Sequence, residues 1–178
     1  MALIEYTTAQ ETDGRVRELL ERYEEEHGKA GLFNEALANN PDVFEARYEY
    51  GTALMEGGRI DPDIKEFVFV VVSEANSCEY CIGDHKRALL ERFDADETEL
   101  EHVANREFEG LPEHKRAVAA FADQVAEDPK RVTDAHLDGL YGAGYDEEDV
   151  IELLCVATLG LSANAIVDAL SIHPADRE

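Results

Sequence analysis

Basic residues are scarce in this chain. Sixteen Lys and Arg stand against 41 Asp and Glu among 178 residues, which gives a formal net charge of −25. A surface this poor in cations cannot neutralise the phosphates of a nucleic acid. It also has little attraction for an anionic lipid surface. We therefore expect neither a nucleic-acid partner nor a membrane partner.

The acidic residues are spread along the whole chain and are not confined to a tail. The chain is 44% apolar although only 8% of its residues are aromatic, so its composition is not that of a disordered protein. At about 1 M salt the Debye length falls to roughly 3 Å, and repulsion between surface charges is then screened. We interpret the composition as halophilic, with an ordinary acidic cytosolic protein as the alternative.

Cysteine is also rare, and long apolar runs are absent. The three cysteines are an odd number, and the first residues carry no signal-peptide pattern, which together predict a reducing, cytoplasmic location. Unbroken apolar stretches such as 67–72 and 153–157 are far shorter than the roughly 20 residues of a membrane-spanning helix. We expect no membrane span.

Apolar periodicity and helix start signals predict an all-α protein. About eight helices should form one helical bundle domain over residues 15–178, preceded by an N-terminal extension, 1–14. Only 67–72 is ambiguous, because Phe-Val-Phe-Val-Val-Val has the propensity of a buried strand. Asp61-Pro62, a helix start signal, precedes it, and no helix breaker interrupts the next fourteen or so residues. A helix that is apolar on all sides must lie at the centre of the fold.

The main chemical motif follows this central helix. Cys78 and Cys81 are three residues apart, and His85 follows four residues later. With Asn76 or Ser77 as the N-cap, a helix would begin near Cys78 and place all three side chains on one face. The positive end of a helix favours a thiolate over a thiol, and a nearby histidine can exchange its proton. The motif therefore indicates a redox-active dithiol with its own acid–base group.

Other interpretations of the cysteines remain open. Cys78, Cys81 and His85 could bind zinc with one outside ligand, although the chain has no second C-x-x-C. The two cysteines could also be inert core residues. Cys155 lies in an apolar run and is predicted to be a buried core thiol.

Glu66 lies twelve residues before Cys78. Glu66 followed by Cys78-x-x-Cys81-x-x-x-His85 resembles the signature of the alkylhydroperoxidase D / carboxymuconolactone decarboxylase superfamily, and its peroxidase-related branch in particular. The resemblance extends from about residue 32 to residue 170. In the better-known alkylhydroperoxidases a histidine precedes the second cysteine, whereas this chain has Tyr80. Tyr80 would either orient a water molecule in the proton relay or simply pack.

The resemblance implies a thiol-dependent peroxidase or disulfide reductase. Cys78 and Cys81 would reduce a hydroperoxide, His85 and Glu66 would move the protons, and an external dithiol or thioredoxin-like protein would restore the thiols. Neither a cofactor nor a metal is required, and a homo-oligomer (dimer, trimer or hexamer) is implied. The alternatives are a redox-sensing or binding module without turnover and a lactone decarboxylase. Decarboxylases of the family do not depend on a C-x-x-C pair.

We assign peroxide attack to Cys81, with Cys78 as proton donor and resolving partner. At 1.5 Å rise per residue, His85 is about 6 Å along the helix axis from Cys81 and about 10.5 Å from Cys78. The competing argument is that Cys78 is nearer the helix N-terminus, where the dipole favours a thiolate.

Overall fold

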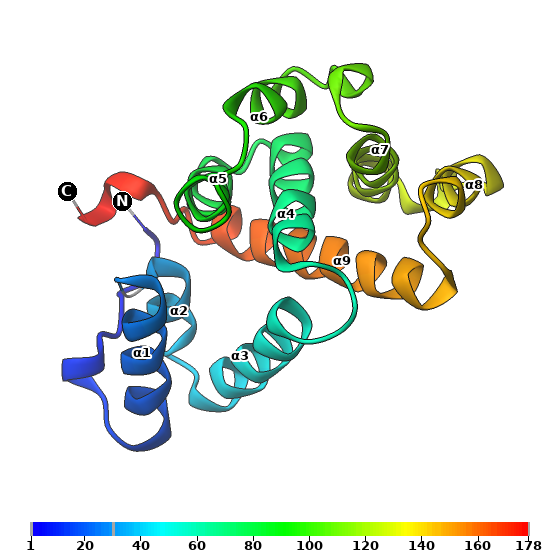
Figure 1. Ribbon diagram of the computed structural model, residues 1–178. Helices are drawn as coiled ribbons and strands as arrows, with labels where there is room; N and C mark the ends of the chain where they lie inside the picture. The colour runs from blue at the N-terminus through cyan, green and yellow to red at the C-terminus, as the bar shows by residue number, and fades with distance from the viewer. Residues whose placement is uncertain (1, 30, 178) are drawn as a thin grey trace.

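The computed structural model describes residues 2–29 and 31–177 (Figure 1). All regular structure in these residues is helical, which confirms the all-α prediction. The α-helices are α1 (Gly14–His27), α2 (Leu32–Leu37), α3 (Pro41–Glu56), α4 (Pro62–Asn76), α5 (Glu79–Phe93), α6 (Glu97–Ala104), α7 (Glu113–Glu127), α8 (Asp134–Gly142) and α9 (Glu147–Ala169). Four short 3-10 helices join them: η1 (Ala9–Glu11), η2 (Phe108–Gly110), η3 (Pro129–Arg131) and η4 (Pro174–Arg177).

Helix α4 is the centre of the fold. It contacts α3, α5, α6, α7 and α9, and Figure 1 shows it standing in the middle of these helices with α9 crossing it. Its segment 67–72 is buried on every side, which explains why the sequence shows no polar face there. Pro62 occupies the first helical turn, as predicted. The ambiguous segment is therefore a central helix and not a strand.

Helix α9 is the second core element and is the most apolar helix. Asp146 caps it by accepting hydrogen bonds from the backbone N–H groups of Glu148 and Asp149. Of the described helices, α9 alone is long and apolar enough to cross a membrane, although 44% of its most apolar stretch is buried inside the protein. A core helix that packs against α4 and α7 has the same composition. The expected absence of a membrane partner and the cytoplasmic location stay predictions.

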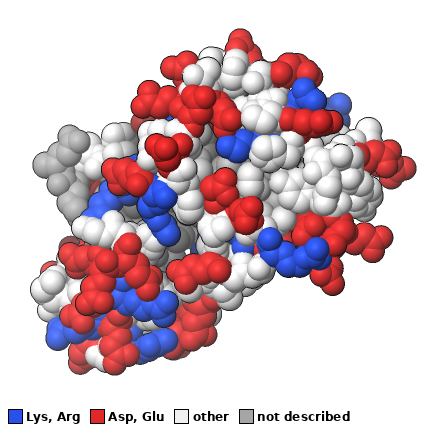
Figure 2. All heavy atoms as spheres, in the orientation of Figure 1, with Lys and Arg blue, Asp and Glu red and all other residues white. Residues whose placement is uncertain are grey.

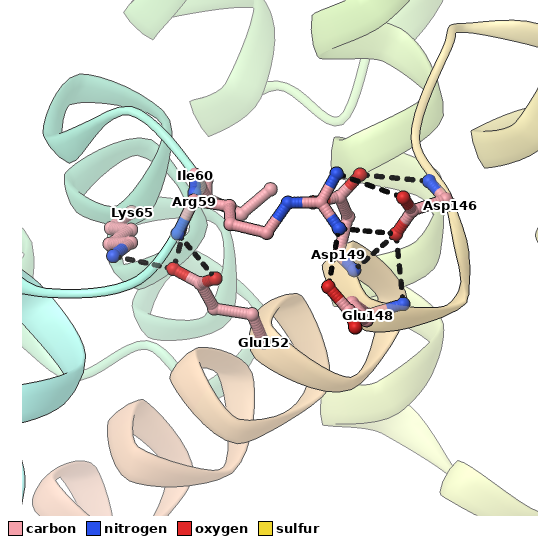
Figure 3. Close-up of polar contacts among 7 residues, drawn as sticks. All are labelled: Arg59, Ile60, Lys65, Asp146, Glu148, Asp149 and Glu152. Atoms are coloured by element: carbon pink, nitrogen blue, oxygen red, sulfur yellow. Dashed lines mark hydrogen bonds and ion pairs between the residues drawn. The ribbon is translucent and has the colours of Figure 1, made fainter.

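A buried ion pair joins α4 to α9 (Figure 3). Lys65 is fully buried, and its Nζ lies 2.6 Å from Oε1 of Glu152. The same ammonium donates hydrogen bonds to the carbonyl oxygens of Leu54 and Gly57. Glu152 also accepts hydrogen bonds from the backbone N–H groups of Arg59, at 2.8 Å, and Ile60, at 3.2 Å. We call this group the Lys65–Glu152 clamp.

The N-terminal segment packs against the C-terminal end of the chain. The backbone N–H of Leu3 donates to the carbonyl of Leu170 at 2.8 Å, and Tyr6 donates to the Asp176 carboxylate at 2.7 Å. Figure 1 shows the two termini close together at one side of the molecule. Ala9, in η1, is buried. The division into an extension, 1–14, and a domain, 15–178, stays a prediction.

Candidate functional site

The two cysteines lie at and just after the two-residue turn, 77–78, between α4 and α5. Ser77 adopts a left-handed conformation (φ 58°), and the N–H of Cys78 donates to the Ser73 carbonyl at 3.0 Å. Cys78 is itself the N-cap of α5. The prediction of Asn76 or Ser77 as the cap is wrong, because α4 continues to Asn76 and Ser77 terminates it. Cys81 is one turn into α5, as expected.

The two sulfurs are reduced and in contact. Their Sγ atoms are 3.0 Å apart, a hydrogen-bond distance and not a disulfide. Cys78 is 0% exposed and Cys81 3% exposed. Both belong to a small apolar cluster with residues of α2 and of the C-terminal region, including Leu32 and Val167. The dithiol is therefore preformed and shielded from bulk water.

The electrostatics of the pair differ from our sequence-based expectation. The hydrogen bond with Cys81 lowers the pKa of the Cys78 thiol. The same bond, together with burial, raises the pKa of Cys81. Loss of a proton from the pair is thus favoured at Cys78, whereas the sequence argument placed the thiolate on Cys81. Because the sulfurs are in contact, a proton transfer between them exchanges the two roles.

Glu66 and His85 form a hydrogen bond beside the dithiol. Oε2 of the Glu66 carboxylate lies 2.6 Å from Nδ1 of His85, and the Phe69 ring stacks on the imidazole at a centroid distance of 4.1 Å. A carboxylate on Nδ1 favours the tautomer with its proton there and leaves Nε2 as the acceptor. Within the part of the chain that the structure describes, Nε2 has no hydrogen-bond partner. The imidazole is therefore held by a carboxylate on one side and an aromatic ring on its face.

Cys81, His85 and Glu66 open into one cavity of about 450 Å³. Cys78 is not part of its lining, so only Cys81 of the two sulfurs faces the cavity. The walls come from α1, α2, α3, α4, α5 and α9, which include segments far apart in the sequence. On the face that Figure 2 shows, acidic side chains are spread among uncharged ones, and Lys and Arg atoms form several small groups, one of them between α5 and the α1–α2 pair. The structure thus brings three of the four expected site residues to one cavity, with Cys78 directly behind Cys81.

Several residues of the cavity are not part of the sequence motif. The backbone N–H of Phe33 donates to the Tyr80 hydroxyl at 3.4 Å, and burial raises the pKa of that phenol. Tyr80 therefore holds α2 against the dithiol turn, in addition to packing. Phe69 lies one helical turn after Glu66, a spacing from which its place beside His85 could have been predicted. Arg47 comes from α3, and nothing in its local sequence indicated the site.

The remaining candidates have structural positions. Glu74 forms an ion pair with Lys86 at 2.5 Å. Cys155 is half-buried, so the prediction of a buried thiol is wrong. The reason is that α9 is apolar on its outer side as well as on its core side. Among residues 2–29 and 31–177, no group of three or more His, Cys, Asp or Glu could hold a metal ion.

Comparison with known proteins gives a family and a fold. Residues 41–123 match the model of the carboxymuconolactone decarboxylase family. A peroxidase-related protein from Ralstonia eutropha JMP134, described as an alkylhydroperoxidase AhpD core, has a TM-score of 0.87 and 23% identity over 98% of this chain and 93% of its own. A peroxidase-related protein from Silicibacter sp. TM1040 has a TM-score of 0.83 and 22% identity over 98% and 95%.

A third similar structure has a different named activity. A cysteine-to-alanine variant of the debrominase Bmp8, in complex with 2,3,4-tribromopyrrole, has a TM-score of 0.82 and 20% identity over 99% of this chain and 95% of its own. No curated protein matches the sequence. At these identities the solved structures show the fold, and with the family match they support a peroxidase-related or decarboxylase-type function. Residues 41–123 are thus similar to the carboxymuconolactone decarboxylase family, and the chain has the fold of the alkylhydroperoxidase AhpD core protein.

Proposed function

We propose that the protein is a thiol-dependent peroxidase that reduces organic hydroperoxides. One observation carries the proposal. Two reduced sulfurs 3.0 Å apart open, at Cys81, into the cavity that also holds the His85–Glu66 pair. A dithiol in contact distance can become a disulfide with little movement, and a histidine with a carboxylate on Nδ1 is a suitable proton carrier.

The reaction begins when the proton of Cys81 moves to His85, which becomes an imidazolium. The Cys81 thiolate then attacks the outer oxygen of the hydroperoxide, an S–O bond forms and the O–O bond breaks. The leaving alkoxide takes a proton from the imidazolium and departs as an alcohol. Cys78 next attacks the Cys81 sulfenic acid, which releases water and forms the disulfide. One hydroperoxide and one dithiol give one alcohol, one water and one disulfide.

An external dithiol completes the cycle. Its thiolate attacks the protein disulfide, and a second exchange returns Cys78 and Cys81 to thiols while the reductant becomes a disulfide. Because the sulfurs are only 0–3% exposed, a reductant must reach Cys81 through the cavity. A small dithiol or an extended dithiol arm fits this access better than a flat protein surface.

The size of the cavity favours an organic substrate. A volume of about 450 Å³ lies within the range of roughly 300–1,000 Å³ that is typical of sites for organic ligands. Hydrogen peroxide is little larger than a water molecule, which occupies about 30 Å³ in the liquid, so it would fill only a small part of this cavity. Phe33 and Phe69 contribute aromatic surface to the walls.

The assignment of Cys81 as the attacking sulfur rests on access. The lowered pKa of Cys78 argues for the reverse assignment, but Cys78 lies behind Cys81 and does not line the cavity. Trapping the sulfenic acid after one equivalent of peroxide, with mass spectrometry, separates the two. Cys78→Ser should carry the adduct on Cys81, and Cys81→Ser should carry little on Cys78. The opposite pattern would reverse the assignment.

The debrominase of the same fold supports a second candidate, reductive dehalogenation of a small aromatic ring. The sulfur pair could supply the two electrons: an aryl halide and a dithiol would give the arene, a halide ion, a proton and a disulfide. The cavity has aromatic walls at Phe33, Phe69 and Tyr48 that suit a flat ring. A redox sensor that oxidises once and a lactone decarboxylase are the remaining alternatives.

Peroxide consumption tests the proposal. Cumene hydroperoxide is supplied with dithiothreitol or dihydrolipoamide to wild type, Cys81→Ser and the matched control Cys155→Ser. Repeated turnover by wild type and Cys155→Ser, with loss in Cys81→Ser, is expected. A single equivalent consumed with either reductant would favour the sensor, and debromination of a bromopyrrole without peroxide turnover would favour the dehalogenase.

A further inference from the structure

Three arginines contribute to the cavity lining: Arg47, Arg87 and Arg92. Arg87 is neutralised, because its guanidinium lies 2.6 Å from Asp84 and 3.8 Å from Glu91. Neither Arg47 nor Arg92 forms an ion pair with any described residue, in a chain where 41 acidic residues face 16 basic ones. Two unneutralised cations in one cavity of so acidic a protein need an explanation.

Arg47 is the more informative of the two. It is half-buried, whereas Arg92 is exposed. One terminal nitrogen donates to the Ser162 hydroxyl at 2.8 Å, and the other donates to the Leu159 carbonyl at 3.0 Å. A guanidinium has five N–H donors, so these two bonds orient the group and leave further donors free. A half-buried cation that is fixed in place but not neutralised is suited to receiving an anion.

The surroundings of Arg47 connect it directly to the dithiol turn. Its guanidinium carbon lies 5.5 Å from the centre of the Phe33 ring. The backbone N–H of Phe33 donates to the Tyr80 hydroxyl, and Tyr80 is the neighbour of Cys81 in α5. One continuous wall therefore leads from the cation to the attacking sulfur. Burial lowers the pKa of Arg47, which agrees with the absence of a nearby carboxylate.

The other charges of the lining restrict the anion. Five acidic side chains also line the cavity: Glu26, Glu56, Glu66, Asp84 and Glu91. A doubly charged phosphate ester would be repelled by these groups more strongly than a singly charged carboxylate. At the high salt to which the composition points, an exposed cation such as Arg92 is screened, whereas the half-buried Arg47 keeps more of its attraction.

We propose that Arg47 binds the carboxylate of the substrate, so that the preferred substrates are hydroperoxides of organic acids. The carboxylate lies at Arg47, and the hydroperoxide group reaches Cys81 along the Phe33–Tyr80 wall. This inference rests on the proposed peroxidase function and adds the substrate class. Arg47 is a binding residue that fixes orientation, and the redox step remains that of the two sulfurs.

The test compares the para-carboxylate of cumene hydroperoxide with its methyl ester. The reacting group is the same in both, so the ratio of their kcat/KM values measures recognition of the carboxylate alone. Wild type should prefer the acid by about tenfold to a hundredfold, the range expected for a charge-assisted hydrogen bond. Arg47→Gln should bring the ratio close to one, and Arg47→Lys should restore part of it.

Arg17→Gln is the matched control. Arg17 is the other half-buried arginine without an ion pair in the described chain, and it donates to the Ala9 carbonyl outside the cavity. The control should keep the wild-type ratio. A wild-type ratio near one, or a ratio that survives in Arg47→Gln, would overturn the proposal even if every hydroperoxide is turned over.

Equilibrium binding keeps the two proposals separate. Para-isopropylbenzoate and its methyl ester have the same shape as the substrates but cannot be reduced. Calorimetric titration of reduced wild type should show tighter binding of the acid than of the ester, and Arg47→Gln should lose the difference. If no hydroperoxide is turned over, the peroxidase function fails, while this titration still decides whether Arg47 receives a carboxylate. Equal binding of acid and ester by wild type would refute it.

Discussion

Replacing Glu152 with glutamine should destabilise the protein strongly although it changes a single group. Glu152→Gln removes the only carboxylate within reach of the Lys65 ammonium in the described structure (Figure 3). Lys65 is 0% exposed, so the charge left behind cannot be solvated. It would keep only the carbonyl oxygens of Leu54 and Gly57 as partners.

The magnitude follows from burial. Breaking a buried ion pair by removing one partner typically costs about 3–5 kcal/mol. The Glu152 side chain is 12% exposed, and the glutamine carbonyl can still accept one backbone hydrogen bond from the α3–α4 connection. We therefore expect a loss of about 2–4 kcal/mol in the free energy of unfolding.

Lys65→Met is the control for this reasoning. It leaves Glu152 with the N–H groups of Arg59 and Ile60 and with partial access to water. The methionine fills a buried site with apolar atoms of similar length. The cost should therefore be clearly smaller, about 1 kcal/mol. The two partners of one ion pair should thus have unequal effects.

The pH dependence gives an independent check. Burial acts to raise the pKa of Glu152, but hydrogen bonds from the Arg59 N–H, Lys65 and the Ile60 N–H outweigh it, so the pKa lies below its usual value. A lowered pKa in the folded state contributes stability above the unfolded pKa, about 4.3. That contribution is lost as the pH falls through the folded value. The difference in the free energy of unfolding between wild type and Glu152→Gln should therefore become smaller as the pH is lowered.

Urea denaturation at constant high salt, followed by circular dichroism, measures these differences. A loss of less than about 1 kcal/mol for Glu152→Gln would show that the clamp is weakly coupled to folding. Equal losses for Glu152→Gln and Lys65→Met would refute the argument that the buried ammonium dominates. If the difference in unfolding free energy between wild type and Glu152→Gln is unchanged in acid, the carboxylate charge is not its cause.

Three further predictions follow from the composition, the surface and the site. Melting temperatures in about 0.1 M and 2 M potassium chloride should differ greatly, since the screening length changes from about 10 Å to less than about 3 Å; equal values would refute the halophilic interpretation. Val43, Tyr50 and Ile151 are 48–61% exposed on the outer faces of α3 and α9, so light scattering at micromolar concentration and high salt should show a homo-oligomer, and Ile151→Glu should shift it towards the monomer; a wild-type monomer would end this idea. Glu66→Gln should lower the peroxidase rate by about 10²–10⁴-fold without changing the melting temperature, because it releases the imidazole from its carboxylate; an unchanged rate would return Glu66 to an ordinary helix-terminal acid.

Local signals in the sequence were sufficient for the central helix and for the spacing of the motif. Asp61-Pro62 fixed the start of α4, and the absence of a polar face in 67–72 placed it at the centre of the fold. The twelve-residue offset between Glu66 and Cys78 resembles the family signature, and this resemblance indicated that the two residues belong to one site. These features lie within about 25 residues of one another, so local periodicity and spacing are enough to predict them.

Features that depend on contacts between distant helices could not be predicted. Cys78, and not Asn76 or Ser77, caps α5, because the length of α4 is set by its packing and not by a local stop signal. The pKa values of the two thiols depend on the hydrogen bond between them and on their burial by other helices. Arg47 reaches the site only because α3 packs on α9, where Leu159 and Ser162 orient its guanidinium.

Lys65 and Glu66 link the stability of the fold to the geometry of the site. They are consecutive residues, so their side chains leave α4 in directions about 100° apart. Lys65 pairs with Glu152 on α9, and Glu66 pairs with His85 on α5. One ion pair therefore fixes α4 against the core helix, and the next residue uses that fixed helix to hold the imidazole. A rotation of α4 large enough to release Glu66 from His85 would also separate the Lys65 ammonium from its carboxylate and carbonyl partners. The rotation would therefore leave an unpaired charge in the protein interior, which is strongly unfavourable. The position of the acid–base pair is thus maintained by a contact on a different side of α4 from Glu66.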